Sequence, residues 1–267
     1  QTVTGVQTCA LPILVRWKAD TVARLAPHLG YALLAALVLG VGLAAMAAPS
    51  GVDLMVAVGL VLAVWVTATS LQSVWAQLSA KRSVVEGLRR LPAGVYGMVL
   101  AHVGLAVTVV GITVVSAYAE ESRLRMSPGD EAALAGYTFR FQGVEQARGP
   151  NYQAAKGTVT VTHDGDPVAT LHPEKRNYAS GGMPMTEAGI DPGFTRDIYA
   201  SLGQSLDAEG AWSVRLYHKP FVRWIWLGAL LMAAGGMVAL ADRRYRVARR
   251  REAPATAGAA APAAGEA

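Results

Sequence analysis

The chain has 267 residues, of which 52% are hydrophobic and only 16% are charged. Soluble domains carry about 25% charged residues, so this composition excludes an ordinary soluble domain for the whole chain and predicts a polytopic membrane protein. The formal net charge of +5 does not predict a nucleic-acid partner. The basic residues form short clusters beside apolar runs, where membrane orientation explains them. We therefore expect contact with membrane lipids and not with nucleic acid.

The first 13 residues, QTVTGVQTCALPI, fit nothing that follows them. They have neither the basic start nor the long apolar middle of a signal peptide. We interpret residues 1–13 as a non-native leader and exclude them from fold reasoning. The sequence then continues as if from the middle of a protein, which predicts a C-terminal fragment.

Residues 14–118 are expected to hold three transmembrane helices. The first apolar run covers about residues 29–48 and the second about 54–75. The Pro49-Ser50-Gly51 turn signal separates them. Because this connection is short, the two spans should form an antiparallel hairpin.

A third apolar run, residues 95–118, contains the polar residue His102. A transmembrane helix needs roughly 20 apolar residues, and an imidazole inside one requires a partner. Histidine is also the commonest metal-ligating side chain. One reading is therefore an axial ligand of a membrane haem, and the other is a histidine hydrogen-bonded to a neighbouring helix.

Two basic clusters predict the topology. The segment before the third span holds four basic residues against Glu86, and the chain after the fourth span, about 221–241, is again basic. Short basic loops face the cytoplasm. We therefore expect both termini inside, four spans, and residues 119–220 as one external domain. Residues 242–267 should form a basic and disordered cytoplasmic tail.

The external domain is expected to be a small antiparallel β-barrel or sandwich of about five strands. Tyr137, Phe139 and Phe141 alternate with polar residues, which is the period of a half-buried strand. The alternation recurs at 158–162 and 212–216. The fold class is thus a membrane all-α protein with an inserted antiparallel β domain.

No catalytic triad, phosphate-binding glycine loop or zinc-ligand spacing can be recognised, so catalytic residues are unknown. Arg215, Lys219 and Arg223 lie at the external end of the fourth span, interleaved with aromatic residues. Such a pattern is typical of an aromatic belt with cations at the headgroup level. The alternative is that these cations bind an anionic ligand such as haem propionates.

Several short segments carry a family resemblance in this order: AHVGLAV (101–107), RMSPGD (125–130), GPNY (149–152), EKRNY (174–178), MTEAGID (185–191), RDIY (196–199), KPFVRWIW (219–226) and DRRYR (242–246). Around one membrane histidine, they resemble the C-terminal part of the CcmF family, to which NrfE proteins are similar. GPNY, EKRNY and MTEAGID fall between the recognisable strands, so we expect them to be loops gathered on one surface.

The resemblance implies a haem lyase subunit of bacterial cytochrome c maturation, in the inner membrane with its β domain in the periplasm. Haem would come from the carrier CcmE and be attached to the CXXCH motif of apocytochrome c, with CcmH- or CcmI-type proteins as partners. The resemblance also implies a b-type haem between two transmembrane histidines. His102 matches the second of them, and the haem iron would be its metal.

The sequence departs from the family in one respect. The tryptophan-rich periplasmic segment and the two periplasmic histidines of the family have no match in this chain. We therefore expect a fragment that is not active alone. One alternative is a non-catalytic scaffold for the maturation complex. The other is a transporter subunit, against which the scarcity of ionisable residues in the spans argues.

Overall fold

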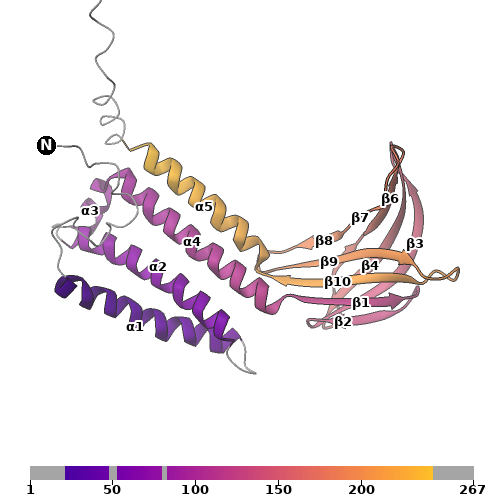
Figure 1. Ribbon diagram of the computed structural model, residues 1–267, viewed down its shortest axis with the longest axis horizontal. Helices are drawn as coiled ribbons and strands as arrows, with labels where there is room; N and C mark the ends of the chain where they lie inside the picture. Colours follow the sequence, from indigo (N-terminus) through magenta and orange to yellow (C-terminus); the bar gives the residue numbers. More distant parts are fainter. Residues whose placement is uncertain (1–21, 48–52, 80–82, 243–267) are drawn as a thin grey trace, which may run out of the picture.

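The computed structural model describes residues 22–47, 53–79 and 83–242. A bundle of helices forms one end of the molecule and a β domain forms the other (Figure 1). The predicted leader 1–13, the turn at 49–51 and the tail from residue 243 onward lie outside the described residues. So do Lys81 and Arg82 of the basic loop.

Five helices are described: α1 Val22–Ala47, α2 Leu54–Leu78, α3 Val84–Arg90, α4 Ala93–Tyr118 and α5 Val222–Leu240. Within the described residues, α1, α2, α4 and α5 are long and apolar enough to cross a membrane. The predicted four-helix membrane architecture is confirmed, and the protein is a multi-pass membrane protein. The short helix α3 was not predicted, since its seven residues were read as loop.

Local hydrogen bonds satisfy several polar groups of α2, although Trp65 Nε1 and Gln72 Oε1 are buried without a partner among the described residues. The Asp53 carboxylate accepts from the backbone N–H groups of Met55 and Val56 and caps the helix. The Thr67 and Ser70 hydroxyls donate to the carbonyls of Ala63 and Val66 at 2.8 and 2.7 Å. Because these side chains bond within their own helix, they can lie in hydrocarbon without a partner on another helix.

Glycines at intervals of seven residues bring α4 and α5 into direct backbone contact. Gly97, Gly104 and Gly111 of α4 face α5, and Gly228 and Gly235 of α5 face α4. A Cβ placed on Gly104 would lie 2.7 Å from the Gly228 carbonyl oxygen. Since apolar side chains gain nothing by leaving lipid, this close approach is what holds the two helices together.

We predict that Gly235→Val lowers the free energy of unfolding by about 1–3 kcal/mol, because the valine side chain would overlap the backbone of α4 at Gly97 and Ala101. Gly236→Val is the matched control, since no atom lies within 4 Å of a Cβ there. Thermal unfolding of the detergent-solubilised protein measures both. Equal losses in the two variants would show that helix propensity, and not packing, accounts for the effect.

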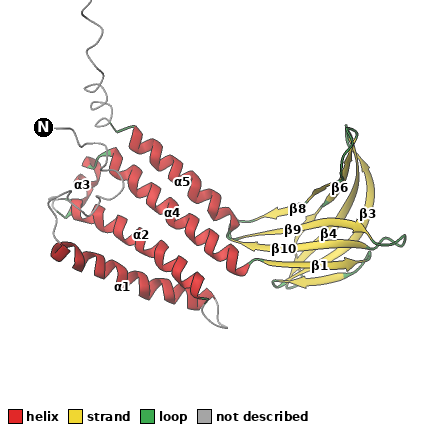
Figure 2. Ribbon diagram, in the orientation of Figure 1, coloured by secondary structure: helices red, strands yellow, loops and turns green. Residues whose placement is uncertain are grey.

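The β domain consists of two antiparallel sheets (Figure 2). One sheet has four strands in the order β1-β10-β9-β8: β1 Glu120–Met126, β10 Trp212–Pro220, β9 Arg196–Ser205 and β8 Gly189–Pro192. The other has six: β2 Glu131–Leu134, β3 Tyr137–Arg148, β4 Tyr152–His163, β6 Glu174–Tyr178, β7 Met185–Glu187, and β5 Asp166–Leu171 paired with β4.

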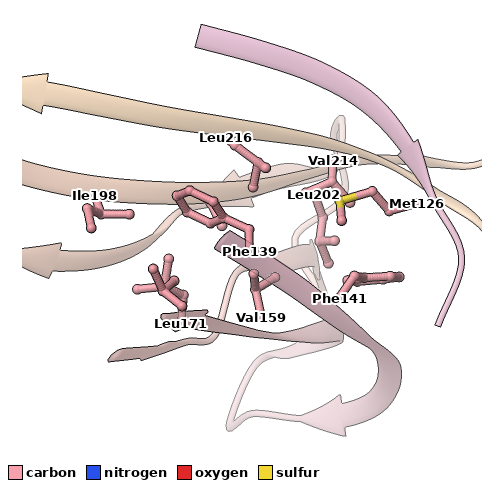
Figure 3. Close-up of a cluster of buried hydrophobic side chains, with 11 residues drawn as sticks. Met126, Phe139, Phe141, Val159, Leu171, Ile198, Leu202, Val214 and Leu216 are labelled. Carbon is pink, nitrogen blue, oxygen red and sulfur yellow. The ribbon is translucent and has the colours of Figure 1, made fainter. Parts of the chain in front are cut away.

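Alternate side chains of the two sheets meet in one core. Phe139 and Phe141 of β3 are fully buried against residues from the opposite sheet, including Leu202, Val214 and Leu216 (Figure 3). Burying side chains of this size contributes roughly 1.5–3 kcal/mol each. The domain is therefore a sandwich, which decides between the two predicted forms.

Two expectations about the domain were wrong. It contains ten strands and not about five. EKRNY is strand β6, and MTEAGID contributes β7 and β8, so these segments are not loops. No residue of β6 is fully buried, and its side chains therefore lack the apolar alternation on which the prediction relied.

Candidate functional site

His102 lies in α4 with its imidazole oriented by the backbone. The Nδ1 atom is 2.8 Å from the Met98 carbonyl oxygen. A carbonyl oxygen can only accept, so Nδ1 carries the hydrogen in the neutral ring and Nε2 presents a lone pair. Metal-ligating histidines use this arrangement, with one nitrogen donating to a fixed acceptor and the other binding the metal.

The helix geometry turns His102 away from α5. It precedes Gly104 by two residues, which is about 200° of rotation on a helix with 3.6 residues per turn. It lies nine residues after the start of α4 at Ala93, or roughly 14 Å along the axis. The side chain is half-buried, and Ala106, one turn on, is buried. His102 is therefore available to a partner on the side opposite α5.

An apolar cavity of about 370 Å³ lies one turn beyond His102. It is lined by residues of all four membrane helices, among them Leu39, Ala63, Thr67, Val107 and Trp224. His102 does not line it, although Val103 and Ala106 do. The oriented imidazole and this apolar wall therefore adjoin along α4, but the cavity does not include the imidazole.

The part of the chain that the structure describes supplies one imidazole for such a group. His163 and His172 lie in the β domain, as does His218, and among the described residues no three His, Cys, Asp or Glu side chains cluster as a metal site. His28 lies in α1, but its side chain is outside the described part. The assignment of His102 as haem ligand therefore stays a prediction.

The three predicted cations do not form one cluster: Arg215 and Lys219 lie on β10, and Arg223 lies at the start of α5. The Arg223 Nε atom donates to the Asp197 carboxylate at 3.0 Å. The Lys219 ammonium stands over the rings of Tyr199 and Tyr217, at 5.2 and 5.3 Å from their centroids. Lys219 pairs with Asp197 in the strand register, but only Arg223 forms an ion pair with this carboxylate in the described part of the chain.

Arg215 is separate from the other two. It lies four residues before Lys219 on β10, or roughly 13 Å away along the strand. It stands opposite Arg123 in the register of β1, and within the described residues no carboxylate forms an ion pair with it. Binding of haem propionates by these cations stays a prediction. Because Arg215 is separate, it would bind a propionate alone, whereas Lys219 and Arg223 would bind one together.

Sequence reasoning missed a stack of three rings at the membrane end of the sandwich. The Tyr137 ring lies between His163 and His218, at centroid distances of 4.7 and 5.8 Å. The Arg196 Nε atom donates to the Tyr137 hydroxyl at 3.2 Å. Strand pairing of Tyr137 with His163 creates half of this stack, which no sequence spacing signals.

Burial lowers the pKa of His218 below the ordinary value of 6.5, Glu120 opposes this shift and Arg196 adds to it. The unfolded chain therefore binds a proton more tightly in the window just below about pH 6.5. Folding stability contributed by neutral His218 is complete above that window and is lost as the pH falls through it.

We predict that His218→Phe flattens the fall in melting temperature between about pH 7.5 and about pH 5, because phenylalanine keeps a ring on Tyr137 but takes up no proton. Thermal unfolding across this range is the measurement. His172→Gln, at an exposed position, should retain the slope of the parent protein. If His218→Phe retains it too, other groups cause the pH dependence.

A polar groove of about 600 Å³ lies at the end of the domain where β3 turns into β4. It is lined by Arg148, Asn151, Tyr152, Asn177 and Tyr178, among others. The GPNY turn and the end of EKRNY thus lie side by side, because Tyr152 and Tyr178 are paired across β4 and β6. Tyrosine, asparagine and arginine are frequent in protein-binding surfaces.

Comparison with known proteins identifies the family. Residues 117–220 match a family model described as the CcmF C-terminal beta-sandwich. The chain is 50% identical over 191 residues to the cytochrome c-type biogenesis protein CcmF of Pseudomonas aeruginosa, an alignment that covers 68% of this chain and 29% of that protein. It is 42% identical over 239 residues to CcmF of Escherichia coli, with coverage of 87% and 35%. The chain belongs to the CcmF family.

The chain corresponds to the C-terminal portion of CcmF and spans about a third of the length of its relatives. A solved structure of a cytochrome c haem lyase CcmF superimposes with a TM-score of 0.66 over 85% of this chain and 36% of that one. Its sequence identity is 20%, so this likeness shows the fold alone.

Proposed function

We propose that this chain is part of a CcmF-type haem lyase and serves cytochrome c-type biogenesis in the inner membrane of a bacterium. The observation that supports this most is the 42–50% identity to several CcmF proteins, over a sandwich domain and membrane helices that share one fold with a solved haem lyase. The substrates would be haem delivered by CcmE and the CXXCH thiols of apocytochrome c, to which haem is joined by thioether bonds.

In this proposal, His102 is an axial ligand of a b-type haem held in the membrane. The Met98 carbonyl fixes the imidazole and leaves Nε2 for iron. Such a haem supplies one-electron redox chemistry, whose potential depends on the axial ligands and on burial. The apolar side chains of α2 and α4 around the adjoining cavity exclude water from this region.

We predict that His102→Gln, in a complete CcmF-family protein carrying this sequence, lowers bound b-type haem by more than ~10-fold, because an amide can bond to Met98 but does not replace an iron ligand. Absorption spectra of the purified protein measure haem, and the yield of holocytochrome c measures function. His102→Ala should give the same result, with the protein still inserted in the membrane.

Ile112→Ala is the control on the same helix, at a position that is 48% exposed and removed from His102 by ten residues. It should leave the haem spectrum unchanged. Unchanged haem in His102→Gln would contradict the ligand role and favour a purely structural hydrogen bond.

The β domain is proposed to dock partners and not to perform chemistry. Among its described residues the polar groups form ion pairs such as Arg176–Glu174, and no three-residue metal site is found. CcmE, CcmH- or CcmI-type proteins and apocytochrome c are the proposed partners, and the groove beside Asn151 and Tyr178 is a surface suited to one of them. This part of the chain would then act as a scaffold within the lyase. The alternative of a transporter subunit predicts that the purified protein contains no haem.

We predict that reporter fusions after Leu91 and after Tyr245 signal a cytoplasmic location, and that an insertion in the Asp164–Gly165 turn signals the periplasm. The physical reason is the basic pair Arg89 and Arg90 at the start of the third span. Alkaline phosphatase fusions report a periplasmic location, and green fluorescent protein fusions report a cytoplasmic one. A periplasmic signal from the Leu91 fusion would overturn this topology.

A further inference from the structure

A cavity of about 490 Å³ lies where α5 meets the β domain. Its polar part consists of Asp197 and Tyr199 from β9 and Arg223 from α5. Its apolar part descends along α5 and ends in three residues, Trp226, Leu227 and Leu230. The cavity therefore joins a polar end at the β domain to an apolar face of the membrane helix α5.

The cation of this cavity is held in a fixed orientation. Asp197 is 4% exposed, and it accepts from Arg223 Nε at 3.0 Å, from Gly193 N–H at 3.1 Å and from the Tyr199 hydroxyl at 3.3 Å. Because the carboxylate occupies only Nε, the two terminal nitrogens of Arg223 make no hydrogen bond to any described residue. Arg223 is half exposed, so these donors remain available to an anion.

A second cation lies close to this cavity: the Lys219 ammonium is 5.2 Å from the ring centroid of Tyr199, which lines the cavity, although Lys219 itself does not line it. Lys219 is paired with Asp197 in the strand register and makes its contacts with tyrosine rings and with no carboxylate in the described part of the chain. Arg223 and Lys219 exceed the single charge of Asp197 by one positive charge, counted from these three groups alone. The polar end of the cavity thus presents the terminal nitrogens of Arg223 to an anionic group, and Lys219 adds a second cation outside the lining.

The apolar end is open toward lipid. Trp226 is 70% exposed and Leu230 69% exposed, and both lie on the membrane helix α5. Trp224 fixes this corner, since its Nε1 atom donates to the Phe194 carbonyl at 3.2 Å. An occupant must therefore combine one anionic group with a long apolar chain.

We propose that this cavity binds a single anionic phospholipid. Its phosphodiester accepts from the terminal nitrogens of Arg223, with Lys219 nearby, and an acyl chain lies along Trp226, Leu227 and Leu230. Arginine is suited to this task because its planar fork matches two phosphate oxygens. A haem is a poorer match, since no histidine, cysteine or methionine lines the cavity and the Tyr199 hydroxyl already donates to Asp197.

The test is a titration of the 267-residue chain, purified in a zwitterionic detergent, with phosphatidylglycerol or phosphatidylcholine, followed by native mass spectrometry. We expect the parent chain to retain phosphatidylglycerol in preference to phosphatidylcholine. Arg223→Gln should weaken phosphatidylglycerol binding by roughly tenfold, the effect of losing a charge-assisted hydrogen-bonded pair. Arg123→Gln, which removes an exposed charge of the β domain outside the cavity, should leave it unchanged.

A second variant separates binding from folding, because Arg223→Gln leaves Asp197 without its partner. Trp226→Ala keeps that ion pair and should weaken the lipid by about fivefold, through lost apolar contact. Equal binding by the parent, Arg223→Gln and Trp226→Ala would overturn the proposal. So would glycerophosphoglycerol, the headgroup alone, binding as tightly as the lipid, or haemin displacing the lipid at equal concentration.

Discussion

The close packing of α4 and α5 is the contact on which the rest of the molecule depends. These helices carry the two connections to the β domain, and their glycines set the distance between those connections. β1 leaves α4 and β10 leads into α5, and the two strands pair directly from Glu120 with His218 to Met126 with Trp212. The sandwich therefore begins and ends in two neighbouring strands that continue the contact between α4 and α5.

The direction in which α5 leaves the sheet is set at a single residue. Phe221 has φ 54°, a left-handed conformation that costs a bulky side chain about 1–3 kcal/mol. Its N–H donates to the Thr195 carbonyl and its ring packs on Trp224 at 4.8 Å, and these contacts hold the corner. Because Arg223 follows two residues later, the same corner brings its guanidinium to Asp197. The corner between sheet and helix therefore positions the cation as well as the helix.

Features that depend on periodicity alone could be predicted from the sequence. The apolar runs gave four membrane helices, and the alternation of Tyr137, Phe139 and Phe141 gave a core strand. Strand β1 was missed because only Leu124 and Met126 of EESRLRM face the core. The stack around Tyr137 and the Asp197–Arg223 pair could not be predicted, since both join strands or helices whose register the sequence does not specify. The orientation of His102 toward Met98 follows from helix geometry. The partner of its Nε2 atom cannot be derived from the sequence in this way.

His102 and the Arg223–Asp197 pair lie at different levels along the membrane helices. Gly111 of α4 packs against Trp224 and Ile225, so the start of α5 lies about nine residues, or roughly 14 Å, beyond His102 along α4. Apolar residues such as Val107 and Val110 separate the levels. An isolated charge at the level of His102 would be far more costly than one at the end of the helix, where Arg223 is half exposed and paired with Asp197. A neutral imidazole with one nitrogen already bonded is therefore the form of polar residue that this depth accepts, and charged ligands belong at the corner of α5 and the β domain.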